Sequence, residues 1–164
     1  MTKRLFCAAA LCMAGMLAVS AQSVRFNNEG KLKIVQFTDI HWRAGDPATA
    51  DAAANMNRVL DEEKPDLVVY TGDVTTAKPA TEGLDKALEP VISRGLPYAI
   101  TFGNHDDEQD MTRPQLYDYV KKKQGCLDAK AEGTDFAISV TSADGKQAKA
   151  VIYVMDSNAY STID

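Results

Sequence analysis

Apolar runs alternate with helix-like segments along the first two thirds of the chain. Residues 31–38 alternate apolar and polar side chains, and residues 66–70 and 96–100 are nearly continuous apolar runs, so each predicts a strand with buried surface. Between them, residues 46–64 and 81–93 repeat apolar positions at helical spacing, which predicts two helices. This order of strand, helix, strand, helix, strand predicts a parallel sheet with right-handed crossovers.

A different pattern occupies the last third. Arg113-Pro114 opens a third predicted helix that runs to about Lys123, and we expect the lysines at its end to complement the helix dipole. Residues 136–140 and 148–155 then alternate like strands around Asp144-Gly145, a favoured hairpin turn. The predicted fold class is therefore α/β, with parallel strands and alternating helices followed by a β-hairpin.

The first 21 residues have the pattern of a signal peptide. Lys3 and Arg4 precede an apolar stretch from Leu5 to Val19, and small residues follow at the positions that a signal peptidase recognises. The apolar stretch is shorter than the roughly 18 residues that a membrane span needs, and no basic cluster follows it. We expect cleavage near Ala21, export to the periplasm or the exterior, and no stable membrane association. Residues 22–31 would then be a lead-in, and residues 32–164 the functional domain.

Export also changes the cysteine count and the charge. Cys7 and Cys12 would leave with the signal peptide, so Cys126 would be the single thiol, no internal disulfide could form, and a small buried apolar role is expected for it. Two of the 18 basic residues would leave as well, so 16 basic against 23 acidic residues give a formal net charge of −7. This charge argues against nucleic acid or an anionic membrane surface as the partner.

Polar motifs follow each of the three predicted parallel strands. They are Asp39-Ile40-His41, Gly72-Asp73 and Gly103-Asn104-His105-Asp106. Because the carboxyl ends of parallel strands meet at one edge, these side chains should converge there. Carboxylates, an imidazole and an amide oxygen suit ions such as Mn, Fe or Zn.

Two such ions about 3.5 to 4 Å apart can clamp a phosphoryl group and generate hydroxide near neutral pH. Gly72 lets the backbone pass close and leaves the Asp73 carboxylate free to be shared by both ions. His105, flanked by Asp106, would hold the phosphate and protonate the leaving oxygen.

Several of these residues also allow simpler interpretations. Asp39 alone could be a helix cap, and Trp42 could be a rim aromatic or a packing residue. The acidic run from Asp106 to Glu108, with Asp110, favours a solvated helix entry over a third metal site. For Asp156, after the last strand, a solvated turn is favoured over a ligand role.

The three motifs together carry a resemblance. They resemble the amino-terminal half of the calcineurin-like metallophosphoesterases, and the stretch from Lys33 to Ser157 is similar to the purple acid phosphatase-like members. The resemblance implies that Asp39 and His41 bind a first metal ion, Asp73 bridges, and Asn104 binds a second ion. It implies that His105 is the substrate-facing acid, supported by Asp106. The implied fold is a four-layer α-β-β-α sandwich in which two mixed sheets face each other between helices.

Two departures from that family change the expectation. Thr76 stands where the coloured phosphatases have a tyrosine, so no tyrosine ligand is expected. The family also supplies further histidines from its later half, whereas this chain has only His41 and His105. Asp73 and Asn104 alone would hold the second ion. We therefore expect the carboxyl-terminal part of the domain to be missing and the chain by itself to be weakly active or inactive.

The sequence thus predicts an exported dinuclear metal-dependent phosphoesterase that hydrolyses a small phosphomonoester or diester with metal-bound hydroxide. The alternative is a non-catalytic exported metal-binding or interaction domain derived from such an enzyme. A weaker third interpretation is a carrier of one ion through Asp39, His41 and Asp73. The sequence leaves the substrate, the metal identity and the oligomeric state open.

Overall fold

The computed structural model describes residues 23–130, 133–161 and 163. The predicted signal peptide, residues 1–21, lies outside these residues. No helix in the described ranges has the length and apolar content needed to cross a membrane.

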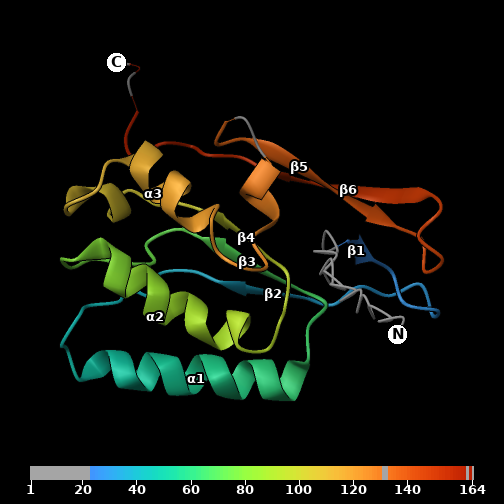
Figure 1. Cartoon of the computed structure of the whole chain (residues 1–164), viewed down its shortest axis with the longest axis horizontal. Helices are drawn as coiled ribbons and strands as arrows, with labels where there is room; N and C mark the ends of the chain where they lie inside the picture. Colours follow the sequence, from blue (N-terminus) through green and yellow to red (C-terminus); the bar gives the residue numbers. More distant parts are fainter. Residues whose placement is uncertain (1–22, 131–132, 162, 164) are drawn as a thin grey trace, which may run out of the picture.

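Strands and helices alternate through the first part of the chain, as predicted, and a hairpin follows (Figure 1). In chain order the elements are β1 Val24–Arg25, β2 Ile34–Phe37, α1 Ala48–Glu63, β3 Leu67–Thr71, α2 Ala80–Ile92, β4 Tyr98–Thr101, the 3-10 helix η1 Asp106–Glu108, α3 Arg113–Val120, the 3-10 helix η2 Leu127–Lys130, β5 Phe136–Thr141 and β6 Ala148–Val154.

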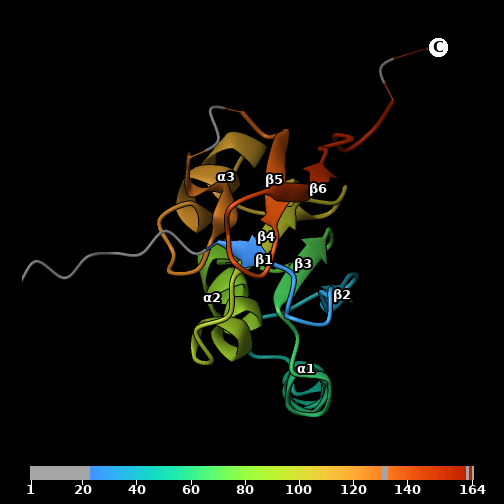
Figure 2. The ribbon, with the colours of Figure 1, turned by 90° about the vertical axis from the view of Figure 1, so that its right-hand side faces the viewer.

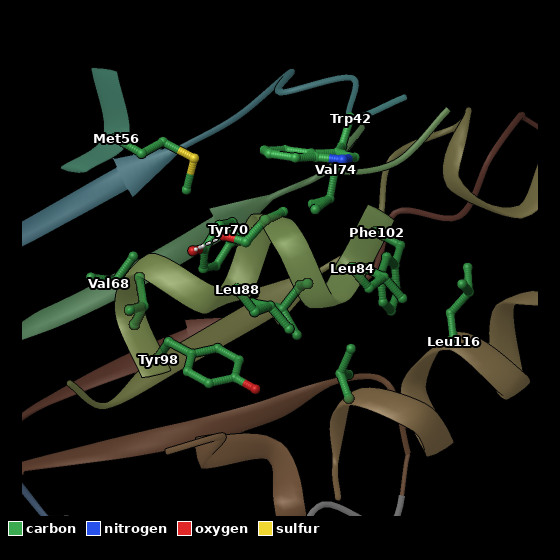
Figure 3. Packing of buried hydrophobic residues seen from close by; sticks show 14 of the residues in the cluster. Trp42, Met56, Val68, Tyr70, Val74, Leu84, Leu88, Tyr98, Phe102 and Leu116 are labelled. Carbon is green, nitrogen blue, oxygen red and sulfur yellow. Dashed lines mark hydrogen bonds between the residues drawn. The ribbon is translucent and has the colours of Figure 1, made fainter. Parts of the chain in front are cut away.

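The predicted parallel sheet is confirmed. Strands β2, β3 and β4 lie in that order and pair in parallel, from Ile34 opposite Leu67 to Thr71 opposite Thr101. Helices α1 and α2 lie side by side along this sheet (Figure 1). Their buried residues, among them Met56, Leu84 and Leu88, form the main core with Val68 and Tyr98 of the sheet (Figure 3).

A second sheet faces the first. It has the order β1-β5-β6, in which β1 runs parallel to β5 and β5 runs antiparallel to β6. A second core lies between the sheets, with Leu67 and Ala99 from one and Val24, Val140 and Val154 from the other. Figure 2 shows α1 and α2 on one side of the parallel sheet and β5 and β6 on the other. The described residues therefore form three of the four layers of the implied sandwich.

The sequence does not predict strand β1, because the polar stretch around Val24 and Arg25 favours a lead-in without regular structure. The strand has only two residues, and its pairing partners are Val140 and Thr141. Val24 is buried between the sheets, with 3% of its surface exposed. The amino-terminal segment thus completes the mixed sheet.

The helix boundaries follow local chemistry. The Asp46 carboxylate accepts a hydrogen bond from the Ala48 amide at 2.9 Å and so caps α1, which begins one residue after Pro47. Helix α3 opens with a capping box between Thr112 and Gln115 and ends at Val120, three residues before the predicted end.

The dipole role of the lysines after α3 stays a prediction, and Lys123 has further partners. Its ammonium donates to Asp85 at 2.6 Å and lies 4.1 Å from the centre of the Tyr119 ring. The Lys121 ammonium donates to the Gly133 carbonyl at 3.2 Å. These lysines make tertiary contacts beyond the end of the helix.

Candidate metal centre

The loops after β2 and β3 run side by side and carry the first two motifs. The Asp39 amide donates to the Gly72 carbonyl at 3.1 Å, and the His41 amide donates to the Asp73 carbonyl at 2.9 Å. Trp42 continues the pairing by donating to the Val74 carbonyl at 2.9 Å. Backbone hydrogen bonds therefore fix the two predicted ligand loops against each other at the carboxyl edge of the parallel sheet.

Asp39, His41 and Asp73 converge at this edge. One ligand atom from each lies within 4.8 Å of the others. The Nε2 atom of His41 is 3.8 Å from an Asp39 oxygen and 3.7 Å from an Asp73 oxygen. Two carboxylates and an imidazole around one point match the donor set of Mn, Fe or Zn, so the residues present fit a metal ion.

The backbone at all three residues adopts the left-handed region. The φ angles are 52° at Asp39, 49° at His41 and 50° at Asp73, a conformation that few residues other than glycine adopt. Such conformations cost free energy and persist where the surrounding structure holds them, often at functional sites. Here the paired loops hold them, and the three side chains point to one place as a result.

The loop after β4 packs against Asp73 because two glycines leave room for it. A Cβ atom on Gly72 would lie 2.7 Å from the Gly103 Cα atom, and a Cβ atom on Gly103 would contact the Asp73 carboxylate. The His105 amide donates to the same carboxylate at 3.0 Å. Asn104 lies between Gly103 and His105 in the sequence and is half-buried. The contacts of these two neighbours hold the segment that carries Asn104 against Asp73.

His105 lies close to His41 at the candidate site. The centres of the two rings are 5.8 Å apart. The Nδ1 atom of His105 is 2.8 Å from a Glu108 carboxylate oxygen. This hydrogen bond raises the pKa of His105 and lowers that of Glu108. The other ring nitrogen of His105, Nε2, takes no part in this hydrogen bond.

The Asp106 carboxylate binds backbone and not the His105 ring. It is fully buried and accepts four amide hydrogen bonds, from Asp73, Val74, Thr75 and Gly103, at 2.7 to 3.0 Å. Burial raises the pKa of this carboxyl, and the four amides oppose that shift. Glu108 therefore binds the imidazole, while Asp106 ties the loop after β4 to the loop after β3. The predicted support of His105 by Asp106 stays a prediction.

Other interpretations of the polar residues are also settled by their surroundings. Trp42 is a packing residue with 8% of its surface exposed, and Figure 3 shows it beside Val74. The acidic run is not a uniformly solvated entry, since Asp106 is buried and Asp110 caps α2 by accepting from the Ala80 amide at 2.9 Å.

Comparison with known proteins agrees with this geometry. The family model of the calcineurin-like phosphoesterases matches residues 32–153. The chain belongs to this family. A metallophosphoesterase of this kind implies divalent metal ions, and the Asp39, His41 and Asp73 group is the place in the described ranges where such ions fit.

Several curated phosphoesterases are similar to the chain. "Probable inactive purple acid phosphatase 14" of Arabidopsis thaliana is 31% identical over 134 residues, which cover 71% of this chain and 33% of that protein. "Phosphatase DCR2" of Saccharomyces cerevisiae is 38% identical over 113 residues, covering 58% and 20%. "Uncharacterized metallophosphoesterase YkuE" of Bacillus subtilis is 35% identical over 77 residues, covering 45% and 26%. The chain thus spans a third or less of the length of these relatives. No solved structure gives a significant match.

The sequence pattern does not predict an ion pair that lies beside the site. The prediction of a solvated turn for Asp156 is wrong: only 2% of its side chain is exposed, and it pairs with Arg113 at 2.9 Å. For Arg113 the sequence predicts only a place at the start of a helix. The position of Asp156 directly after an apolar strand was the available signal. The ligand roles of Asp39, His41, Asp73 and Asn104 stay predictions, as does the acid role of His105.

Proposed function

We propose that this chain is the metal-binding part of an exported dinuclear phosphoesterase that hydrolyses small phosphomonoesters or diesters. The observation that carries the proposal is the convergence of Asp39, His41 and Asp73 at the edge of the parallel sheet, with His105 beside them. Membership in the calcineurin-like phosphoesterase family supports it.

Each residue would have a separate role at the site. Asp39 and His41 would hold a first ion, Asp73 would be shared, and Asn104 would contribute to a second. When bound, the ions would act as Lewis acids on the phosphoryl oxygens and lower the pKa of a coordinated water. His105 would contact the phosphoryl group through Nε2 and donate a proton to the leaving oxygen, because Glu108 engages Nδ1 and orients the ring.

A cavity next to His41 would receive the substrate. Its volume is about 270 Å³, and its lining includes His41, Arg43, Asp46 and Thr49. The Arg43 side chain makes no hydrogen bond or ion pair with the residues that the structure describes, so its guanidinium is available to a phosphoryl oxygen or an anionic leaving group. A small phosphorylated molecule suits a cavity of this size and lining.

A second candidate function is binding of a single metal ion without hydrolysis. The observation that favours it is the donor count: the convergent group contains three residues around one point, and the chain has no histidine besides His41 and His105. Asp73 and Asn104 offer few protein donors for a second ion. Consistent with either outcome, one relative is named as an inactive phosphatase and another as a phosphatase.

Calorimetry and turnover of the chain from residue 22 to residue 164 separate these candidates. The proposal predicts two Mn²⁺ ions per chain, the second bound more weakly, and slow hydrolysis of an activated aryl phosphate that Asp73→Ala abolishes. A single Mn²⁺ ion with no turnover would favour the second candidate. No Mn²⁺ binding at all would contradict both.

The exported location has its own test. Expression of the whole chain in a bacterial host should give a mature protein that begins at Gln22 and is found outside the cytoplasm. A cytoplasmic product that retains Met1 or Thr2 would contradict export. The supporting observation is the apolar stretch behind Lys3 and Arg4.

A further inference from the structure

A buried ion pair between Arg113 and Asp156 contacts the loop after β4, and it has no role in the proposed function. The Arg113 guanidinium binds Asp156 through Nε, at 3.0 Å to both carboxylate oxygens, and through Nη2 at 2.9 Å. Only 9% of the Arg113 side chain and 2% of the Asp156 side chain are exposed. Burying two charges is costly unless both are paired and hydrogen-bonded, so the structure has to supply these partners.

The other donors of Arg113 reach the loop that carries Asn104 and His105. Its Nη2 atom donates to the Phe102 carbonyl at 2.7 Å, and its Nη1 atom donates to the Gly103 carbonyl at 2.9 Å. These are the two residues immediately before Asn104. Arg113 therefore holds this loop from its carbonyl side, while the Asp106 carboxylate holds the Gly103 amide at 2.7 Å.

Asp156 is itself held in place from several directions. Tyr117 donates its hydroxyl to the carboxylate at 3.1 Å, and the Asn158 amide donates to it at 2.9 Å. The Asp156 amide donates in turn to Asp135 at 2.7 Å. Burial opposes ionisation of Asp156, but the hydrogen bonds from Arg113 hold its pKa below the ordinary value. Asp156 follows β6, so this anchor connects the mixed sheet to a loop of the parallel sheet.

We propose that Arg113 is a positioning residue for the Asn104–His105 loop and that Asp156 fixes the orientation of Arg113. The planar guanidinium meets a carboxylate and two carbonyls from three separate nitrogens, whereas a lysine ammonium would have to reach all of these acceptors from one nitrogen. The side chains that touch ligand or substrate are thereby held by a second set of contacts that reaches the mixed sheet. This inference rests on the proposed function only where its test measures the binding of Mn²⁺.

Arg94 offers a matched control. It also binds a carboxylate through two nitrogens, with Asp61 at 3.0 and 2.7 Å, and it also donates to a carbonyl, that of Pro90, at 2.8 Å. Its contacts join α1 to α2 and none of them is to a site loop. Arg113→Lys and Arg94→Lys therefore make the same chemical change at a site loop and away from it.

The test measures amide hydrogen exchange in the metal-free chain and Mn²⁺ binding by calorimetry. The quantity compared is the exchange ratio, which is the exchange rate of the His105 amide, a donor to Asp73, divided by that of the Val69 amide in β3. In Arg113→Lys this ratio should rise about tenfold or more, because local opening of the loop becomes easier. The Kd for Mn²⁺ should rise about 10- to 100-fold, the range seen when groups behind metal ligands are altered. Arg94→Lys should leave both quantities unchanged.

Asp156→Asn is the second variant, should Arg113→Lys fail to fold. It keeps the shape of the side chain, removes its charge, and should shift both quantities in the same direction by a smaller factor. A folded Arg113→Lys or Asp156→Asn variant with the exchange ratio of the wild type would overturn the proposal. If the wild-type chain bound no Mn²⁺, the proposed function would fail, and the exchange ratio would still decide the role of Arg113.

Discussion

Replacing Asp106 with asparagine should strongly destabilise the fold, and the reason is geometric. One carboxylate oxygen accepts the amides of Val74 and Thr75, at 2.8 and 3.0 Å, and the other accepts those of Asp73 and Gly103, at 2.8 and 2.7 Å. An asparagine has one oxygen and one NH₂ group. In either flip, the NH₂ group must face two buried N–H donors, so two hydrogen bonds are lost and two donors are left unpaired.

The magnitude follows from those two bonds. A hydrogen bond to a charged group contributes about 1.5–3 kcal/mol, so Asp106→Asn should lower the free energy of unfolding by about 3–6 kcal/mol. Asp110→Asn is the control, because Asp110 uses one oxygen to accept a single amide, that of Ala80, and an asparagine can keep this bond. Both variants remove one negative charge, so an effect of net charge alone would be equal in the two.

Urea denaturation followed by circular dichroism measures this difference from the midpoint and the slope. We expect Asp110→Asn to stay within about 0.5 kcal/mol of the wild type. If Asp106→Asn were destabilised by no more than its control, Asp106 would not be the tie between the loops, and the account of the site geometry would have to be abandoned.

Three further predictions concern space, charge and substrate contact. Gly103→Ala should weaken Mn²⁺ binding in calorimetry, because its Cβ atom would contact the Asp73 carboxylate, whereas Gly133→Ala, with nothing nearer than 4.0 Å, should not. Burial raises the pKa of Asp128 to about 7. The free energy of unfolding of the wild type should therefore fall by up to about 4 kcal/mol as the pH rises from 4 to above 7. In urea titrations at several pH values, Asp128→Asn should lack this pH dependence. Arg43→Ala should raise KM for an aryl phosphate about tenfold with little change in kcat; an unchanged KM would remove Arg43 from the substrate cavity.

The elements that could be predicted from the sequence are those with local signals. Apolar periodicity predicts the parallel strands and their helices. Because the carboxyl ends of parallel strands meet at one edge of the sheet, the sequence also predicts that Asp39, His41 and Asp73 lie close together. The same rule placed Asn104 in the adjoining loop. These predictions needed only the order of elements and the positions of polar residues at strand ends.

The contacts that could not be predicted depend on tertiary structure. Arg113 and Asp156 are 43 positions apart, and no spacing rule connects a helix opener to a residue after a hairpin. Asp106 is next to His105 in the sequence, but the 3-10 turn directs its carboxylate to backbone amides, and Glu108, three residues on, meets the imidazole. The side-chain partners of a loop follow from its backbone path, which the sequence pattern does not specify.

The most direct test of the central claim is anomalous diffraction from crystals of the chain soaked in Mn²⁺. The account predicts a manganese peak within about 2.0–2.3 Å of the Asp39 and Asp73 carboxylates and the His41 Nε2 atom, with any second peak between Asp73 and Asn104. A fully soaked crystal with manganese bound only elsewhere, or with Asp73 far from Asp39, would contradict it.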